Sequence, residues 1–463
     1  MVSFVAELAK SFGSFVTESL RDFRYQSSPK VYATSATIHH RKSTRLPLLL
    51  ESCDSERFIT WERDMNWQLS VCYGCATGYL LLVFTKLWLA RRIVLCKLNQ
   101  QSAHRTTYDG RLFTIVQPIL SGDPLLEEML STNVRNLPTT QFLWMIDWDD
   151  LAGQEIAERI LGNSEQADQQ RIRMVPCPTA ADNVNPKSFK LQLALQHVST
   201  PFFVVLDDDT VVNESSLAVA QNSLQTHDLV TGLPTYRRGQ NLTSDLVAHF
   251  VNDNSVLTYL PLLNFYPPLS INGMYYVSRT TTLVELHGFE VVQHLLCDDY
   301  AVAQWFRSRG KSIDQAIIRL QLATSVARVG DYCRLLHRWM SFACLLARDQ
   351  RPMVQFLLGL LLGLPPILLA VAIATSFSSV YSAMVLVLVL LARRAAIGAA
   401  QRLAFAERLS TNPLVSLIAE LLQPLHLFGA VVVPYIRWRG KLVRVARDHS
   451  FQLVRKRPDR RPS

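Results

Sequence analysis

The chain has 463 residues, of which 49% are hydrophobic and 18% are charged. This balance is too apolar for a purely soluble protein and too polar for membrane helices alone, and it predicts a soluble domain tethered by membrane segments. The net charge of +9 raises a nucleic-acid-binding interpretation, but much of the excess follows the last apolar segment and no recognition motif accompanies it. We therefore expect contact with a membrane and no nucleic-acid partner.

Residues 1–68 are predicted to form an amphipathic and polar N-terminal region. Apolar side chains recur near helical spacing over residues 2–22, which predicts a helix lying on a membrane. The first membrane segment is predicted at residues 69–90, where Lys86 is close enough to the end to extend to the interface. The positive-inside rule places the next domain in the cytosol. The basic residues that support this orientation follow the segment: Arg91, Arg92, Lys97 and Arg105.

Residues 112–345 are predicted to form an α/β domain of alternating strands and helices. The apolar runs at residues 142–146 and 202–206 are short and continuous, like buried parallel strands. Both runs end abruptly in aspartates. Because ligands of open α/β sheets bind at the carboxyl ends of strands, these acids lie where a binding site would be built.

Three acidic clusters lie within this domain. The run Asp207, Asp208 and Asp209 ends the second strand, and mutual repulsion makes it costly unless a cation binds. A solvated acidic turn is the alternative for any one cluster, but three together favour a functional site. Asp298 could instead cap the helix that follows it. The other two clusters are Asp147, Asp149 and Asp150 after the first strand, and Asp298 and Asp299 before a helix.

Residues 353–436 are predicted to be C-terminal membrane segments, in three apolar stretches at 353–374, about 377–392 and 414–436. Residues 437–463 form a basic tail that is also expected in the cytosol. A third full crossing would place this tail outside, so the third stretch is predicted to be re-entrant or interfacial. The arginines between the second and third stretches are expected to mark a cytosolic return: Arg393, Arg394, Arg402 and Arg408.

The order of the motifs DD, DxD, DD and RW, flanked by these apolar segments, resembles inverting glycosyltransferases of the family 2 and family 21 type, which have the GT-A fold. The resemblance is closest to the ceramide glucosyltransferases of family 21 and their bacterial relatives. It extends from about Thr114 to Arg447. The stretches that carry it are residues 118–124, 146–150, 185–187, 232–234, 272–274, 298–300 and 435–439.

The resemblance implies a nucleotide-sugar donor, UDP-glucose, and a divalent cation, magnesium or manganese. An ammonium group suits the donor phosphates, and carboxylates suit the cation. Arg338 and Trp339 match the end of the family's (Q/R)xxRW pattern, which helps to close the donor site. The remaining implied roles are nucleotide contact for Asp149 and Asp150, donor phosphates for Lys187, the cation and diphosphate for Asp207 and Asp209, and the general base for Asp299.

Two departures from the family pattern leave the acceptor open. The first position of the RW-ending pattern is Leu335, and Arg334 stands one residue early. The triple aspartate is also fuller than in the usual animal ceramide enzyme. Both departures concern the acceptor and not the reaction class.

The resemblance implies a multi-pass membrane enzyme that moves a hexose onto a lipid hydroxyl, such as that of ceramide, with inversion. Its catalytic domain is expected to be cytosolic, at the Golgi or ER of a eukaryote or the inner membrane of a bacterium. The apolar stretch 262–270 is expected to line the acceptor's entry, with a buried loop as an equal alternative.

Two other functions are weighed against this one. A processive polysaccharide synthase usually carries more crossings and an intact glutamine or arginine opening the RW-ending pattern. An inactive membrane scaffold is disfavoured because all three acidic clusters are intact, although keeping such charges together is costly.

Overall fold

A computed structural model describes residues 54–103, 107–409, 412–438, 441–446 and 449–456. The amphipathic helix predicted at residues 2–22 lies outside the described residues, as does most of the predicted N-terminal region. The end of the basic tail, after residue 456, lies outside them as well.

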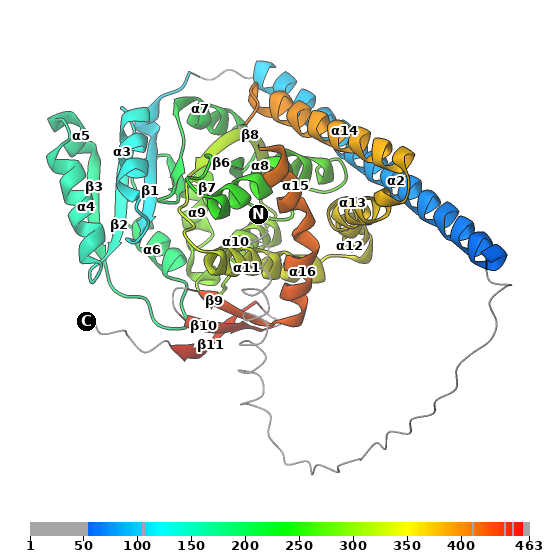
Figure 1. The fold of residues 1–463 in the computed structure, drawn as a ribbon. Coiled ribbons are helices and arrows are strands. Elements are labelled where there is room, and N and C mark those ends of the chain that lie inside the picture. The colour runs from blue at the N-terminus through cyan, green and yellow to red at the C-terminus, as the bar shows by residue number, and fades with distance from the viewer. Residues whose placement is uncertain (1–53, 104–106, 410–411, 439–440, 447–448, 457–463) are drawn as a thin grey trace, which may run out of the picture.

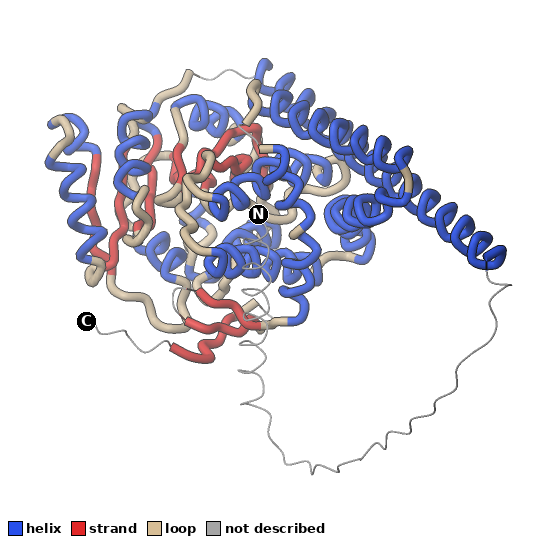
Figure 2. Tube along the Cα trace, in the orientation of Figure 1, coloured by secondary structure: helices blue, strands red, loops and turns tan. Residues whose placement is uncertain are grey.

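An eight-stranded sheet forms the centre of the α/β domain, in the strand order β3-β2-β1-β4-β7-β6-β8-β5 (Figures 1 and 2). Strands β3, β2, β1 and β4 are parallel, β7 is antiparallel to β4 and β6, and β8 is parallel to β6. The predictions of buried parallel strands at residues 142–146 and 202–206 are confirmed as β2 and β4. The strands are β1 (Phe113–Ile119), β2 (Gln141–Asp147), β3 (Ile172–Cys177), β4 (Phe202–Leu206), β5 (Thr210–Val211), β6 (Leu229–Tyr236), β7 (Tyr275–Arg279) and β8 (Ile313–Leu322).

Helices cover both faces of this sheet. Successive side chains of a strand point to opposite faces, so Trp144 and Val204 join one core while Met145 and Val205 join the other. Helices α3, α4, α7, α8 and α11 contribute to the first core, and α6, α9 and α10 to the second. The helices of this domain are α3 (Leu126–Asn136), α4 (Leu151–Gly162), α5 (Gln166–Arg171), α6 (Pro186–Leu195), α7 (Glu214–Ser223), α8 (Leu242–Leu262), α9 (Thr280–Glu285), α10 (Asp298–Ser308) and α11 (Val329–Arg348).

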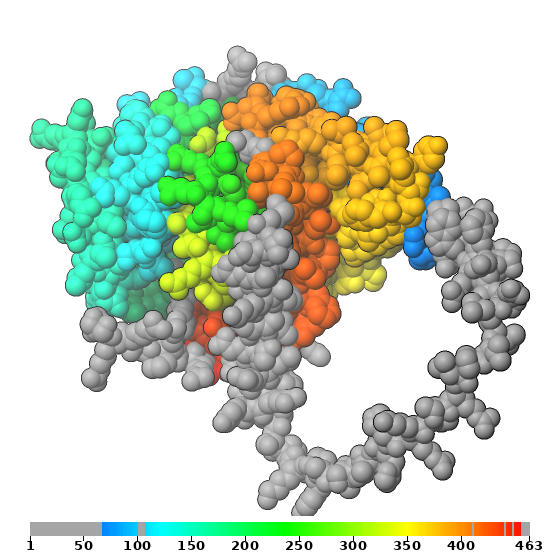
Figure 3. Space-filling view, in the orientation of Figure 1, coloured from blue at the N-terminus to red at the C-terminus, as the bar shows by residue number. Residues whose placement is uncertain are grey.

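Long apolar helices lie beside this domain. Helix α2 (Asp54–Ala103) is continuous through residues 69–90, and it packs against α13 (Leu364–Thr375) and α14 (Val380–Phe405) (Figure 1). Three helical stretches of the described chain are long and apolar enough to cross a membrane: Pro352–Ser378, Val380–Phe405 and Pro413–Val432. In the space-filling view they form one body next to the α/β domain (Figure 3). A crossing at residues 69–90 stays a prediction.

Pro365 and Pro366 do not end the first of these stretches. Helix α12 (Pro352–Leu358) continues through a π-helical turn, Gly359–Gly363, into α13, and both prolines lie in the first turn of α13. Because proline has no N–H group, the wider π turn accommodates the hydrogen bonds that are missing there.

The structure corrects the placement of two charged residues in the apolar segments. Helix α14 continues to Phe405, so Arg393 lies within the helix and not in a cytosolic loop, and it is 3% exposed. Lys86, predicted to extend to the interface, is buried instead. The prediction for Lys86 followed from its place near the end of an apolar segment, and that for Arg393 from the arginines that follow one. Neither pattern could identify an acidic partner from another helix.

The start of the basic tail forms a small antiparallel sheet of β9 (Tyr435–Trp438), β10 (Lys441–Val445) and β11 (Phe451–Lys456). Lys441 Nζ lies 2.8 Å from Asp182 Oδ1 of the catalytic domain. Residues Leu295 and Ser450 form an isolated bridge. These contacts place the start of the tail against the catalytic domain.

The third apolar stretch consists of two shorter helices, α15 (Pro413–Leu421) and α16 (Gln423–Val432), which pack against α8 and α11. Before α15, the backbone N–H of Asn412 donates to His249 Nε2 of α8 at 2.8 Å. After α16, the carbonyl oxygen of Tyr435 lies 3.0 Å from His337 Nε2 of α11. Because both ends contact the same domain, the geometry favours a re-entrant or interfacial path over a full crossing.

We expect protease added to sealed vesicles to attack both the catalytic domain and an epitope placed after Ser463, or neither of them. The reason is that β9–β11 contact the catalytic domain, so we expect the two to share one side of the membrane. Immunoblots against each part provide the measurement, and vesicles opened with detergent provide the control in which both are cleaved. Cleavage of one part with protection of the other would show that α15 and α16 cross.

Candidate active site

The loop after β1 joins two of the acidic clusters. The backbone N–H of Leu120 donates to Asp208 Oδ2 at 2.8 Å, and the N–H of Ser121 donates to Asp150 Oδ2 at 2.8 Å. Strand β1 lies between β2 and β4, so its carboxyl end is flanked by the two strand ends that carry these aspartates. The strand order therefore makes neighbours of two clusters that are well separated in the sequence.

Asp150 makes its hydrogen bonds within the protein. It is the N-cap residue of α4, where its Oδ1 accepts the N–H of Gly153 at 3.1 Å, and it also accepts the Ser121 hydroxyl. Burial acts to raise the pKa of Asp150, but these hydrogen bonds outweigh it and lower that pKa. Asp149 accepts the Thr179 hydroxyl at 3.2 Å. Asp150 thus orients the loop after β1, and nucleotide contact by this pair stays a prediction.

Lys187 joins the DxD run to the third acidic cluster. Its Nζ lies 2.6 Å from Asp207 Oδ1 and 3.3 Å from Asp298 Oδ2, and it donates to the carbonyl oxygen of Gly273 at 2.8 Å. Asn185, the N-cap residue of α6, fixes the start of the helix by accepting the backbone N–H of Lys187 at 3.0 Å. Burial acts to lower the pKa of Lys187, but the surrounding carboxylates raise it well above its usual value, so the ammonium stays charged.

Asp299 lies in the first turn of α10, partly buried beside the loop that contains Gly273. Burial, and then the charge of Asp298, raises the pKa of Asp299 to about 8. A Cβ atom at Gly273 would lie 1.8 Å from Asp299 Oδ1, so only glycine fits there. The alternative that Asp298 caps α10 is wrong, because the N-cap residue is Cys297, whose side chain makes no capping hydrogen bond, and Asp298 pairs with Lys187.

Asp209 accepts the hydroxyls of Thr210 at 3.0 Å and Thr324 at 3.3 Å. Burial, and then the charge of Asp207, raises the pKa of Asp209 to about 6. Among the described residues, no group of three or more His, Cys, Asp or Glu side chains could hold a metal ion by itself. One or two carboxylates suffice, however, where phosphate oxygens and water complete the shell of Mg²⁺. Asp207 and Asp209 therefore fit a cation shared with a diphosphate.

Helix α11 brings the RW pair to the same place. Burial lowers the pKa of Arg338, while Tyr236 and the nearby carboxylates act against this shift. The Trp339 ring lies 6.4 Å from that of Tyr236 and 6.0 Å from that of Phe250, measured between ring centroids. The fold thus brings Lys187, the DxD run, the third acidic cluster and the RW pair together, with Asp149 and Asp150 at the neighbouring strand end.

Sequence reasoning missed Lys190. Its Nζ lies 2.9 Å from Asp147 Oδ2 and donates to the carbonyl oxygen of Ile119 at 2.9 Å, and the residue is 1% exposed. It follows Lys187 by one helical turn, and this spacing could have placed both lysines on one face of α6. Tyr236 and Thr324 were missed as well, since neither stands near an acidic motif in the sequence.

The stretch 263–268 lines a cavity of about 400 Å³ together with residues from the end of α2 and the start of β8. None of the predicted site residues lines this cavity. The loop leads directly into Asn272 and Gly273, however, so its position affects the backbone that holds Asp299 and Lys187. Its part in acceptor entry stays a prediction.

Comparisons with known proteins concern the family and the fold of the chain. The family model described as glycosyl transferase family 21 matches residues 72–451. No curated protein matches the chain. Among solved structures, a mannosyltransferase from Pyrobaculum calidifontis in complex with GDP-Man and Mn²⁺ is 16% identical, with a TM-score of 0.46 over 79% of this chain and 98% of that one. Glucosyl-3-phosphoglycerate synthase from Mycobacterium tuberculosis in complex with Mg²⁺ and UDP is 14% identical, with a TM-score of 0.29 over 54% and 82%.

The family match begins within α2 and ends at β11, so it includes the catalytic domain and the C-terminal apolar helices alike. The sheet is the mixed, largely parallel sheet that the resemblance to GT-A enzymes implied, with aspartates at the carboxyl ends of β2 and β4. The chain is therefore a glycosyltransferase with the GT-A fold, and it belongs to glycosyl transferase family 21.

Proposed function

We propose that this enzyme transfers a hexose, glucose from UDP-glucose, to the hydroxyl group of a membrane lipid such as ceramide, with inversion and with a divalent cation. The observation that carries the proposal is the meeting of Asp207 and Asp298 at Lys187, with Asp299 beside them, in a domain packed against long apolar helices. The sugar and the lipid follow from the resemblance to ceramide glucosyltransferases.

The donor side needs positive charge where the diphosphate leaves. A magnesium or manganese ion held by Asp207 and Asp209 would neutralise part of this charge. The Lys187 ammonium is already held there by Asp207. The charge of Asp209 also acts on the Arg338 guanidinium, as do the charges of Asp298 and Asp299. These two cations would stabilise the leaving group without further movement of the backbone.

The acceptor side needs a base for the hydroxyl proton. In an inverting transfer the carboxylate opposite the leaving group takes this proton as the new glycosidic bond forms. Asp299 suits this role because a pKa of about 8 makes it a stronger base than an ordinary aspartate. The ammonium of Lys187 and the N–H of Gly273 stabilise the charged form of Asp299.

An electrostatic link between the proposed base and an apolar cluster that includes the long apolar helices supports a lipid acceptor. An apolar cluster of α2, α8 and α14 includes Ala90, Val256 and Ile397, with Tyr259 packed against it. Burial, and then the charge of Asp299, raises the pKa of Tyr259. One helix, α8, therefore spans the distance from the apolar helices to the surroundings of the proposed base.

Membranes that carry the protein are expected to convert labelled UDP-glucose into a lipid bearing a single hexose. The measurement is to incubate such membranes with labelled nucleotide sugars in parallel and to separate the lipid extract from polymer. Membranes with the Asp299→Asn variant provide the control for endogenous enzymes. Label in a polymer would favour the polysaccharide synthase, and label in neither fraction with any donor would favour the scaffold.

A further inference from the structure

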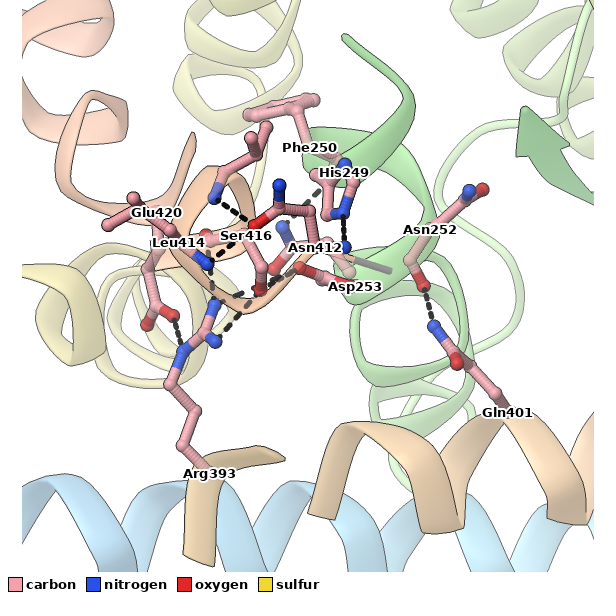
Figure 4. Close-up of polar contacts among 12 residues, drawn as sticks. His249, Phe250, Asn252, Asp253, Arg393, Gln401, Asn412, Leu414, Ser416 and Glu420 are labelled. Carbon is pink, nitrogen blue, oxygen red and sulfur yellow. Dashed lines mark hydrogen bonds and ion pairs between the residues drawn. The ribbon is translucent and has the colours of Figure 1, made fainter. Parts of the chain in front are cut away.

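A buried ionic network joins the membrane helices to the catalytic domain (Figure 4). Arg393 Nε of α14 lies 2.5 Å from Glu420 Oε2 of α15, and Arg393 Nη2 lies 3.8 Å from Asp253 Oδ2 of α8. Arg393 Nη1 donates to Ser416 Oγ at 2.9 Å, and the Ser416 hydroxyl donates to Asp253. The Tyr79 hydroxyl of α2 donates to Glu420 at 3.2 Å. Four helices therefore share one set of charges.

These charges have lost nearly all contact with water, since Arg393 is 3% and Asp253 6% exposed. A charged residue within an apolar helix is rare, and a buried ion pair stabilises a fold no better than apolar residues of the same volume. Attraction between the helices is already provided by the apolar cluster of α2, α8 and α14. The ionic and hydrogen-bonding groups set the register of the helices instead, because they specify which turn of α8 faces α14 and α15.

The same turn of α8 holds the aromatic side of the candidate active site. Asn252, next to the aspartate of the network, accepts the N–H of Tyr236 at 2.7 Å and donates to the carbonyl oxygen of Tyr236 at 2.9 Å. Gln401 of α14 donates to the carbonyl oxygen of Asn252 at 3.1 Å. Phe250 stacks on Trp339. A shift of this turn would therefore move both ring partners of Trp339.

Helix α15 is tied to this stretch of α8 at two levels (Figure 4). His249 accepts the N–H of Asn412, just before α15, and Asp253 accepts the hydroxyl of Ser416 one turn further along. Two ties at different levels prevent α15 from sliding along α8. The membrane helices and the aromatic side of the site thus move as one body.

We propose that Asp253 and Arg393 are positioning residues for the transfer reaction: their network sets the register of α8, and with it the place of Tyr236 and Trp339, relative to the membrane helices. The expected effect on sugar transfer rests on the proposed function, because a lipid acceptor would be presented from the side of those helices. The expected effect on the position of Trp339 rests only on the contacts of α8.

The test uses the full chain in lipid nanodiscs, labelled with 5-fluorotryptophan, and the Trp339 fluorine resonance is assigned by its loss in Trp339→Phe. Asp253→Asn keeps an acceptor for the Ser416 hydroxyl but removes the charge that faces Arg393. We expect this variant to shift or broaden the Trp339 resonance and to lower sugar transfer per folded enzyme about 10- to 100-fold, since small misplacements have such effects. Ser416→Ala is the gentler variant, with smaller changes in the same direction, should Asp253→Asn fail to fold.

Asp314→Asn is the matched control. Asp314 of β8 pairs with Lys97 of α2, so it also links α2 to the catalytic domain, and the side chains of Asp314 and Lys97 are 10% and 17% exposed. This variant should leave the Trp339 resonance in place. The double variant Asp253→Asn/Arg393→Gln should lower transfer no further than the worse single variant, because the two residues act through one network.

An unchanged Trp339 resonance in the variant that folds, or an equal shift in Asp314→Asn, would overturn the positioning role. Additive losses of transfer in the double variant would also contradict it. The fluorine measurement needs neither donor nor acceptor. If the wild-type protein transferred no sugar to lipid, the proposed function would fail while the resonance still decided whether the network positions Trp339.

Discussion

Asp299→Asn is expected to abolish sugar transfer while the affinity for the donor stays near the wild-type value. A general base contributes about 10²- to 10⁴-fold to a reaction rate, and asparagine cannot take the hydroxyl proton. The proposed donor contacts lie at Asp207, Asp209 and Lys187, which the substitution leaves in place. Turnover measured with saturating donor, and the dissociation constant of the nucleotide sugar, check the two halves of the prediction.

Asp298→Asn is the matched control, and it should be milder because this carboxylate pairs with Lys187 and has no proposed proton-transfer role. If Asp299→Asn kept most of its turnover, or lost donor binding in proportion, the base would be assigned wrongly and Asp298 would be tested next.

In the wild type, kcat/KM should rise with pH toward about 8, because the ionised form of Asp299 is the base.

Asp299→Asn should also raise the thermal stability of the free enzyme at pH 8. The folded-state pKa of Asp299, about 8, lies above the value for an unfolded chain. Its contribution to stability is therefore fully present below the unfolded pKa and is lost as the pH rises to about 8. Asparagine does not titrate, so the gain in melting temperature should shrink at pH 5.

Removal of divalent cations is expected to stop sugar transfer, and manganese or magnesium should restore it. Asp207→Asn and Asp209→Asn should each lower turnover by about two orders of magnitude or more, since both would lose charge that holds the cation at the diphosphate. Burial, and then the charge of Asp207, raises the pKa of Asp209, which is the structural reason to expect a cation there. Turnover is measured with excess chelator and after adding back each metal.

Asp208→Asn separates this role from the general loss of an acidic residue. Asp208 Oδ2 accepts the N–H of Leu120, and an asparagine side chain can accept it too, so this variant should lose less turnover than its neighbours. Full activity of the wild type in excess chelator would rule out the cation. Equal losses in all three variants would instead indicate damage to the strand end.

Much of the catalytic domain could be predicted from local patterns. The apolar run at residues 202–206 predicts a buried strand because burial on both faces requires an uninterrupted apolar sequence, and Asp207 must then stand at its end. The third cluster was recognised as two aspartates before a predicted helix, and the RW pair was recognised from the family resemblance. The fold brings these groups together with Lys187 on α6.

Partners of charged residues could not be predicted in the same way. Lys86 stands near the end of an apolar segment, which suggested an interface, and Arg393 begins a group of arginines after another, which suggested a loop. Burial of Arg393 depends on Asp253 and Glu420, which come from two other helices. No local pattern contains that information, because it depends on how α8, α14 and α15 pack.

The sequence alone was enough to predict two buried strands, the acids that follow them, and the apolar stretches of the C-terminal third. These properties depend on hydrogen bonds and burial periodicities that span only a few residues. The tertiary structure alone decided that the loop after β1 links Asp150 to Asp208, that Lys187 stands between Asp207 and Asp298, and that α15 and α16 return to the catalytic domain. Strand order and helix packing set these contacts, because they bring together residues that are distant along the chain.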